Sequence, residues 1–152
     1  MDVALDEELV FRNIHANSNK EVLSFLANQL YQKGFVEESY IEAIQMREKE
    51  YPTGLPSTQP IVAIPHANYE LVHHTTLAIA TLKNPVDFHN MEDTASLLPT
   101  QIVIMMAIGE PHGQVEMLQK IVSIIQNEPL RKQMIAAETD DVLLNLLKKA
   151  IA

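Results

Sequence analysis

The sequence predicts an α/β fold, a three-layer sandwich in which a mixed β-sheet is flanked by α-helices. Two helical patterns come first, short apolar runs follow them, and two further helical patterns end the chain. The run Ile102–Ile108 is apolar throughout, which is typical of a strand buried on both faces. With 152 residues and no repeat or low-complexity tract, residues 1–152 are expected to form a single domain.

The first half of the chain predicts a short strand at 9–11 and two helices. Ser18 and Glu21 have the spacing of a capping box, and Gly34 ends the helix that they begin. The residues expected inside this helix are Val22, Leu23, Leu26, Leu30 and Tyr31. A second helix is predicted at 39–50 and stops at Pro52 and Gly54. Its inward residues are expected to be Tyr40, Ile41, Ile44 and Met46.

The second half predicts strands, then helices. Strands are expected at 61–64, 76–82 and 101–108, and residues 85–88 are expected to pair at a sheet edge. A helix is predicted at 113–126, with one inward stripe formed by Val115, Leu118, Val122 and Ile125. Thr139 is expected to cap the last helix, which has acidic residues in its first turn and Lys148 and Lys149 near its end.

Composition excludes several classes of function. Eleven Lys and Arg against 20 Asp and Glu give a net charge of −9, which argues against binding nucleic acid or an anionic membrane and favours a basic protein partner. No cysteine is present, which excludes a disulfide scaffold and a thiolate nucleophile. The N-terminus is acidic and does not resemble a signal peptide, so we expect a cytoplasmic protein.

The residues most suited to chemistry are His66 and Arg47. His66 follows a predicted buried strand and Pro65, which fixes its own φ and restricts Ile64 to extended geometry. A neutral imidazole in such a mount can attack a phosphoryl group, and a guanidinium such as that of Arg47 matches phosphate oxygens. The alternatives are a structural loop histidine and a solvated helix charge paired with Glu48 or Glu50.

The literal residues add a family resemblance. The run Arg47-Glu48 to Pro52-Thr53-Gly54-Leu55, followed by Ala63-Ile64-Pro65-His66, resembles the signature of the IIA components of the bacterial phosphoenolpyruvate-dependent sugar phosphotransferase system. The likeness is to the mannitol/fructose class, continues through Asn84–Phe88 and the apolar strand, and covers nearly the whole chain. The Tyr-Pro-Thr-Gly sequence at 51–54 is most like the galactitol-type members.

The resemblance implies a phosphoryl carrier. His66 would accept phosphate from the phosphohistidine of HPr, with Arg47 beside it, and pass it to a cysteine of a IIB component, which serves the membrane IIC transporter. A nitrogen-type regulatory IIA module, which acts by phosphorylation-dependent protein binding, is the alternative. There is no Gly-rich phosphate loop and no Walker lysine, so neither ATP nor any cofactor is expected.

Two positions depart from the family pattern or remain open. Many members carry a second histidine where this sequence has Gln114, whose amide can donate a hydrogen bond but cannot become cationic. We favour Gln114 at that position, with His112 as its substitute if the helix begins elsewhere. The hydroxyl of Thr53 fits either a turn residue or a neighbour of the phosphate.

Two further expectations concern metals and docking. His73 and His74 lie close to His66 in sequence, but their spacing matches no metal motif, so no metal site is expected. Apolar side chains around His66 would form the docking surface, and the candidates are Leu55, Ile108 and Met117.

Overall fold

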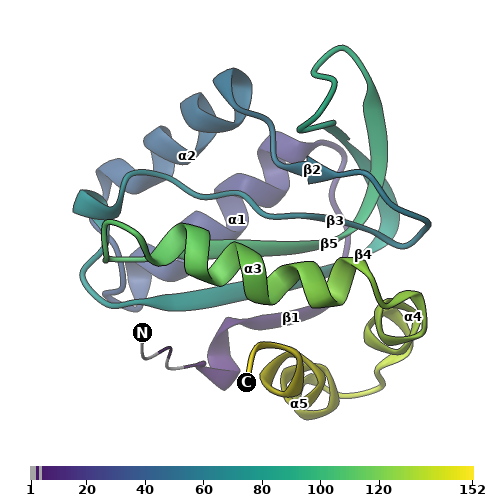
Figure 1. The fold of residues 1–152 in the computed structure, drawn as a ribbon. Coiled ribbons are helices and arrows are strands. Elements are labelled where there is room, and N and C mark those ends of the chain that lie inside the picture. Colours follow the sequence, from purple (N-terminus) through teal and green to yellow (C-terminus); the bar gives the residue numbers. More distant parts are fainter. Residues whose placement is uncertain (1–2, 4) are drawn as a thin grey trace.

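A mixed β-sheet of five strands forms the middle layer of the computed structural model, which describes residue 3 and residues 5–152 (Figure 1). The strands are β1 (Val10–Ile14), β2 (Gly54–Leu55), β3 (Ile61–Ala63), β4 (Thr76–His89) and β5 (Leu97–Ala107). Their spatial order is β1-β4-β5-β3-β2. The pairs β1/β4 and β3/β5 are parallel, whereas β4/β5 and β2/β3 are antiparallel. The long strand β5 is therefore central, as its apolar sequence predicts.

Helices cover both faces of the sheet, which confirms the three-layer prediction. α1 (Asn19–Gln32) and α2 (Ser39–Glu50) pack on one face, and α3 (Gly113–Ile125), α4 (Glu128–Ala136) and α5 (Asp140–Ile151) pack on the other (Figure 1). Two 3₁₀ turns, Glu7–Leu9 and Tyr69–Leu71, lie before β1 and before β4. Within the described residues, no helix is both long and apolar enough to cross a bilayer.

Helix ends follow the local signals in the sequence. The side chain of Ser18 accepts a hydrogen bond from the Glu21 N–H, as the capping box predicts. The carboxylate of Glu21 accepts a hydrogen bond from the N–H of Asn17 at 2.8 Å. A capping box would instead use the N–H of the cap residue, Ser18, one position later. Gly34 has a φ of 81° just past α1, a conformation that glycine adopts without steric cost. Thr139 caps α5 through the Val142 N–H, as predicted.

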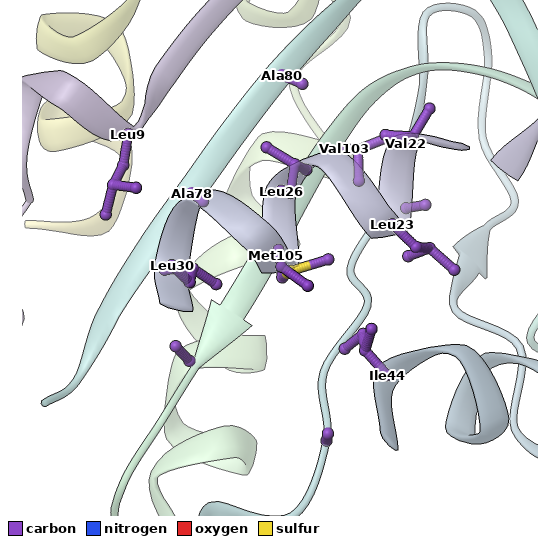
Figure 2. Packing of buried hydrophobic residues seen from close by; sticks show 14 of the residues in the cluster. Leu9, Val22, Leu23, Leu26, Leu30, Ile44, Ala78, Ala80, Val103 and Met105 are labelled. Carbon is purple, nitrogen blue, oxygen red and sulfur yellow. The ribbon is translucent and has the colours of Figure 1, made fainter. Parts of the chain in front are cut away.

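Alternation along β4 and β5 divides the core into two parts. One set of strand side chains faces α1 and α2 (Figure 2) and includes Ala78, Ala80, Val103 and Met105. The opposite set faces α3, α4 and α5 and comprises Leu77, Ile79, Ile102, Ile104 and Met106. Ala78 and Ala80 are small, so Leu26 and Leu30 of α1 can pack closely against the sheet (Figure 2).

The predicted inward stripe of α3 is wrong at two of its four residues, since Leu118 and Ile125 pack partly buried against the core but Val115 and Val122 do not. Val115 is 61% exposed and Val122 is 39% exposed, whereas the neighbouring stripe Met117, Ile121 and Ile124 is fully buried. Apolar residues occupy two adjacent stripes of this helix, so spacing alone does not select the one that faces the sheet. Packing against the strands determines which of the two stripes is buried.

Other expectations need smaller corrections. Residues 85–88 are not a separate strand: they continue β4 past the end of β1 and pair with β5 beyond a register shift. Met46 is 60% exposed and Tyr31 is 39% exposed, so neither belongs to the core. Sequence reasoning also missed α4, although Asn127 caps it and a proline lies in its first turn, a usual start signal.

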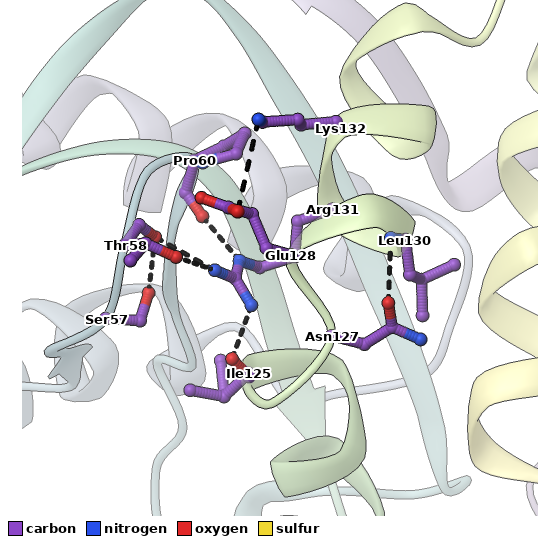
Figure 3. Close-up of polar contacts among 9 residues, drawn as sticks. All are labelled: Ser57, Thr58, Pro60, Ile125, Asn127, Glu128, Leu130, Arg131 and Lys132. Atoms are coloured by element: carbon purple, nitrogen blue, oxygen red, sulfur yellow. Dashed lines mark hydrogen bonds and ion pairs between the residues drawn. The ribbon is translucent and has the colours of Figure 1, made fainter.

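A buried arginine joins α4 to the segment that leads into β3. The guanidinium of Arg131, in a residue only 1% exposed, donates to the carbonyls of Thr58 and Pro60 (Figure 3). It also donates to the carbonyls of Ile124 and Ile125 at the end of α3. A cation at a helix C-terminus satisfies carbonyls that lack partners within the helix.

Candidate active site

His66 lies just beyond β3, at the mouth of the sheet. The backbone remains attached to the neighbouring strand after β3 ends, because the N–H of Met106 in β5 donates to the carbonyl of Pro65 at 2.9 Å. Pro65 is buried and His66 is half-buried, so the ring emerges from a rigid backbone. The predicted mount for His66 is therefore present.

The imidazole of His66 is held in one tautomer. Its Nδ1 lies 2.9 Å from the carbonyl oxygen of Ile64. Because a carbonyl oxygen can only accept, Nδ1 carries the proton, and Nε2 of the neutral ring keeps a free lone pair. That lone pair is what an attack on phosphorus requires.

Burial keeps this ring neutral. Desolvation is the largest cause that lowers the pKa of His66, and the nearby positive charge of Arg47 lowers it further, against the raising effect of the Ile64 hydrogen bond. At pH 7 the ring is therefore unprotonated at Nε2. The depressed pKa also means that His66 contributes to stability above its unfolded pKa, and that this contribution is lost as the pH falls through its folded value.

Arg47 lies in the last turn of α2, near enough to His66 for its charge to lower the pKa of that ring. Its guanidinium carbon is 4.9 Å from the ring centroid of Tyr51, a cation–π distance. Its Nε is buried and has no hydrogen-bond partner within the described part of the chain. A buried guanidinium donor without a partner, beside a neutral imidazole, suits an anionic group that arrives between them.

Thr53 is committed to another contact. It is 2% exposed, its hydroxyl donates to Oε1 of Glu48 at 2.6 Å, and its N–H donates to Oε2 at 2.7 Å. The structure therefore places the Thr53 hydroxyl on a buried carboxylate, which favours the turn role over a role beside the phosphate. Glu48 therefore does not form the surface pair that was the alternative explanation for Arg47.

Sequence reasoning missed Glu48, although a signal was present. Tyr40, Ile44 and Glu48 follow one another at intervals of four residues, so the carboxylate lies on the buried face of α2. Burial raises the pKa of Glu48 to about 6, against the lowering effects of its bonds from Thr53 and of the charge of His89.

Gln114 contacts the residue that follows His66, and His112 does not share this contact. The side-chain amide of Gln114, in the first turn of α3, donates to the carbonyl of Ala67 at 2.7 Å. His112 is exposed and occupies the N-cap position without a capping bond from its side chain. Because the helix begins at Gly113, Gln114 is the one that reaches the loop after His66.

Two of the three docking candidates are wrong. Ile108 and Met117 are fully buried in the core, and Leu55 is partly buried. Exposed large apolar side chains near the ends of the elements around His66 include Met46 on α2 (60% exposed), Tyr51 just past it and Val115 on α3, each 61% exposed, and Tyr69, which follows His66. Within the described residues, no three His, Asp or Glu side chains gather in a way that could hold a metal ion.

Comparison with known proteins identifies the family. The family model described as "Phosphoenolpyruvate-dependent sugar phosphotransferase system, EIIA 2" matches residues 4–150. The galactitol-specific EIIA component of Escherichia coli strain K12 is 30% identical over 117 residues, which cover 76% of this chain and 76% of that protein. The transcriptional regulator ManR of Bacillus subtilis is 31% identical over 133 residues, 87% of this chain but only 19% of the regulator.

Solved structures agree with these relatives. The complex of enzyme IIAMTL with phosphorylated enzyme IIBMTL from Escherichia coli contains a chain that superposes with a TM-score of 0.77 at 26% identity, covering 97% of this chain and 99% of that one. The chain spans about a fifth of the length of relatives such as ManR and the fructose-specific EIIABC component of Bacillus subtilis. The match over residues 4–150, together with the fold and the histidine mount, shows that the chain belongs to the EIIA 2 family of the phosphoenolpyruvate-dependent sugar phosphotransferase system.

Proposed function

We propose that the chain accepts a phosphoryl group on Nε2 of His66 from the phosphohistidine of HPr and passes it to a cysteine of a galactitol-type IIB component. Family membership makes the chain a phosphotransferase that works through a phosphohistidine. The observation that carries the assignment to His66 is its Nδ1–H bond to Ile64, which leaves Nε2 free beside Arg47.

The phosphoryl group is transferred in two successive in-line displacements. The Nε2 lone pair forms a P–N bond while the P–N bond of phospho-HPr breaks, and its electron pair returns to the HPr ring. A IIB thiolate then forms a P–S bond while the bond to Nε2 breaks, which restores the neutral ring. Arg47 offers charge and donors to the transferring group, which carries roughly −1.5 to −2 charges when bound.

The proposal includes a cellular setting. Residues 1–152 act as one IIA domain in the cytoplasm. The chain does not act on the membrane IIC transporter directly, because the phosphate passes first to IIB. The net charge of −9 attracts a basic docking face on HPr. The galactitol assignment is supported by the 30% identity to the galactitol-specific EIIA component.

The alternative is a regulatory IIA module of the nitrogen type, which binds proteins according to its phosphorylation state. This alternative is supported by the similarity to part of ManR, which is named a transcriptional regulator. Both functions use the same histidine, so only the fate of the phosphate separates them.

The test is phosphorylation of the purified chain with phosphoenolpyruvate, enzyme I and HPr, followed by mass spectrometry of the labelled residue. An acid-labile phosphate on His66 is expected, together with its loss in His66→Ala and its retention in the exposed control His112→Ala. Arg47→Ala is expected to slow uptake and to shorten the life of the phosphohistidine. Full uptake by His66→Ala would overturn the assignment.

A second stage separates transport from regulation. Purified galactitol-type IIB is added to the phosphorylated chain, and its cysteine is examined for label. Transfer to the IIB cysteine supports the transport role. Stable retention of phosphate on His66 in the presence of IIB supports the regulatory alternative.

A further inference from the structure

Glu48 is a buried carboxylate that the transfer scheme does not use. It is 6% exposed and directly follows Arg47 on α2. Among the described residues, no Lys or Arg forms an ion pair with it. A buried charge that lacks a cation is costly, so its contacts call for an explanation.

Those contacts lead to His66. Both oxygens of Glu48 accept from Thr53, at 2.7 Å from the N–H and 2.6 Å from the hydroxyl. The carbonyl of Thr53 accepts from the N–H of Ile64 at 3.2 Å. The carbonyl of Ile64 accepts from Nδ1 of His66 at 2.9 Å. A continuous path of hydrogen bonds therefore joins the carboxylate to the ring.

The hairpin of β4 and β5 holds the same loop from its other side. The N–H of Met91 donates to the carbonyl of Gly54 at 2.8 Å. A Cβ at Gly54 would lie 2.7 Å from the carbonyl oxygen of His89, so only glycine permits this approach. The loop is thus fixed between α2 and the hairpin, and Thr53 can transmit the position of Glu48.

We propose that Glu48 is a positioning residue for the phosphoryl-transfer site, which acts by holding Thr53 and Ile64 so that His66 keeps its proton on Nδ1. The inference rests on the proposed role of His66. A neutral imidazole has two tautomers, and only the one with Nδ1–H presents a free lone pair at Nε2. Releasing the loop lets the Ile64 carbonyl move, and the ring then samples both tautomers.

The experiment compares four variants with the parent chain by two measurements. ¹⁵N NMR of the imidazole nitrogens at pH 8 reports the tautomer of His66, and the rate of phosphate uptake from phospho-HPr reports function. The variants are Glu48→Leu, Glu48→Gln, Thr53→Val and the control Glu42→Gln, which changes an exposed carboxylate on the same helix.

Glu48→Leu removes both acceptors, and a slowing of about 10- to 100-fold with mixed tautomers is expected. Glu48→Gln keeps one oxygen for the Thr53 N–H, and its amide can donate to the hydroxyl, so near-parent behaviour is expected. Thr53→Val loses only the hydroxyl bond and should slow uptake about three- to tenfold. Glu42→Gln should match the parent.

A folded Glu48→Leu variant with the parent's tautomer and rate overturns the proposal. If Glu48→Leu does not fold, Thr53→Val is the deciding variant. The proposal is overturned if Thr53→Val has the same His66 tautomer and the same rate of phosphate uptake as the parent. Failure of the proposed function looks different: the parent itself would take no phosphate on His66, while the ring spectra would still report whether Glu48 fixes the tautomer.

Discussion

Arg131→Met tests how much of the stability depends on one buried guanidinium. Methionine keeps much of the apolar stem and removes every donor. The donors lost serve the carbonyls of Thr58, Pro60 and Ile125 and the Thr58 hydroxyl (Figure 3). They also serve the carbonyl of Ile124. Four of these five acceptors are backbone oxygens, which no change of rotamer can turn toward water.

The magnitude follows from what is left behind. Ile124 retains other donors, since the N–H groups of Gln126 and Asn127 also reach its carbonyl. A buried acceptor without a partner costs about 1–3 kcal/mol, and the acceptors of Thr58 and Pro60 are the most affected. Relief of the desolvation cost offsets part of this loss, because burial lowers the pKa of Arg131. A net destabilisation of about 3–5 kcal/mol is expected.

Urea unfolding followed by circular dichroism measures this difference. At about 2–4 °C per kcal/mol for a chain of this size, the melting temperature should fall by about 10 °C. Lys132→Met is the matched control, because Lys132 is an exposed neighbour on the same helix whose contact with Glu128 is 4.0 Å long. The control should stay within about 0.5 kcal/mol of the parent. A loss below about 1 kcal/mol in Arg131→Met would refute the reasoning.

Three further predictions concern the active-site loop. Folding raises the pKa of Glu48 from its ordinary 4.5 to about 6, so the protonated form favours the folded state. Relative to Glu48→Gln, the parent should gain about 2 kcal/mol in unfolding free energy as the pH falls from 8 to 4.5, and a flat difference in urea titrations would contradict this. Gly54→Ala should lose about 1–3 kcal/mol, because its Cβ would lie 2.7 Å from a backbone oxygen; an unchanged melting temperature would show that the hairpin yields freely. Gln114→Leu should slow phosphate uptake, because its amide no longer holds the Ala67 carbonyl, whereas His112→Ala should match the parent. If His112→Ala slowed uptake more than Gln114→Leu, His112 and not Gln114 would take the place of the second active-site histidine.

The histidine site was predictable in part. Pro65 and the apolar strand before it are adjacent in sequence to His66, so its mount could be inferred without knowing the fold. The tautomer could not, since Nδ1–H depends on the exact position of the Ile64 carbonyl. The sequence leaves the role of Thr53 open for a related reason, because the burial of its partner, Glu48, depends on how α2 packs.

The sequence by itself determined the features that depend on neighbours within a turn or two. The ends of α2 and the cap at Thr139 are examples, because a cap is a contact between residues about three positions apart. The apolar length of β5 likewise required a buried strand.

Only the tertiary structure decided which groups meet across the fold. α3 has two apolar stripes of similar character, and packing against the sheet selected Met117 and its neighbours over Val115. Arg131 reaches a carbonyl 73 residues away, and Gln114 reaches one 47 residues away. The physical reason is that a buried polar group must find a partner wherever the folded backbone offers one, and no local pattern records where that will be.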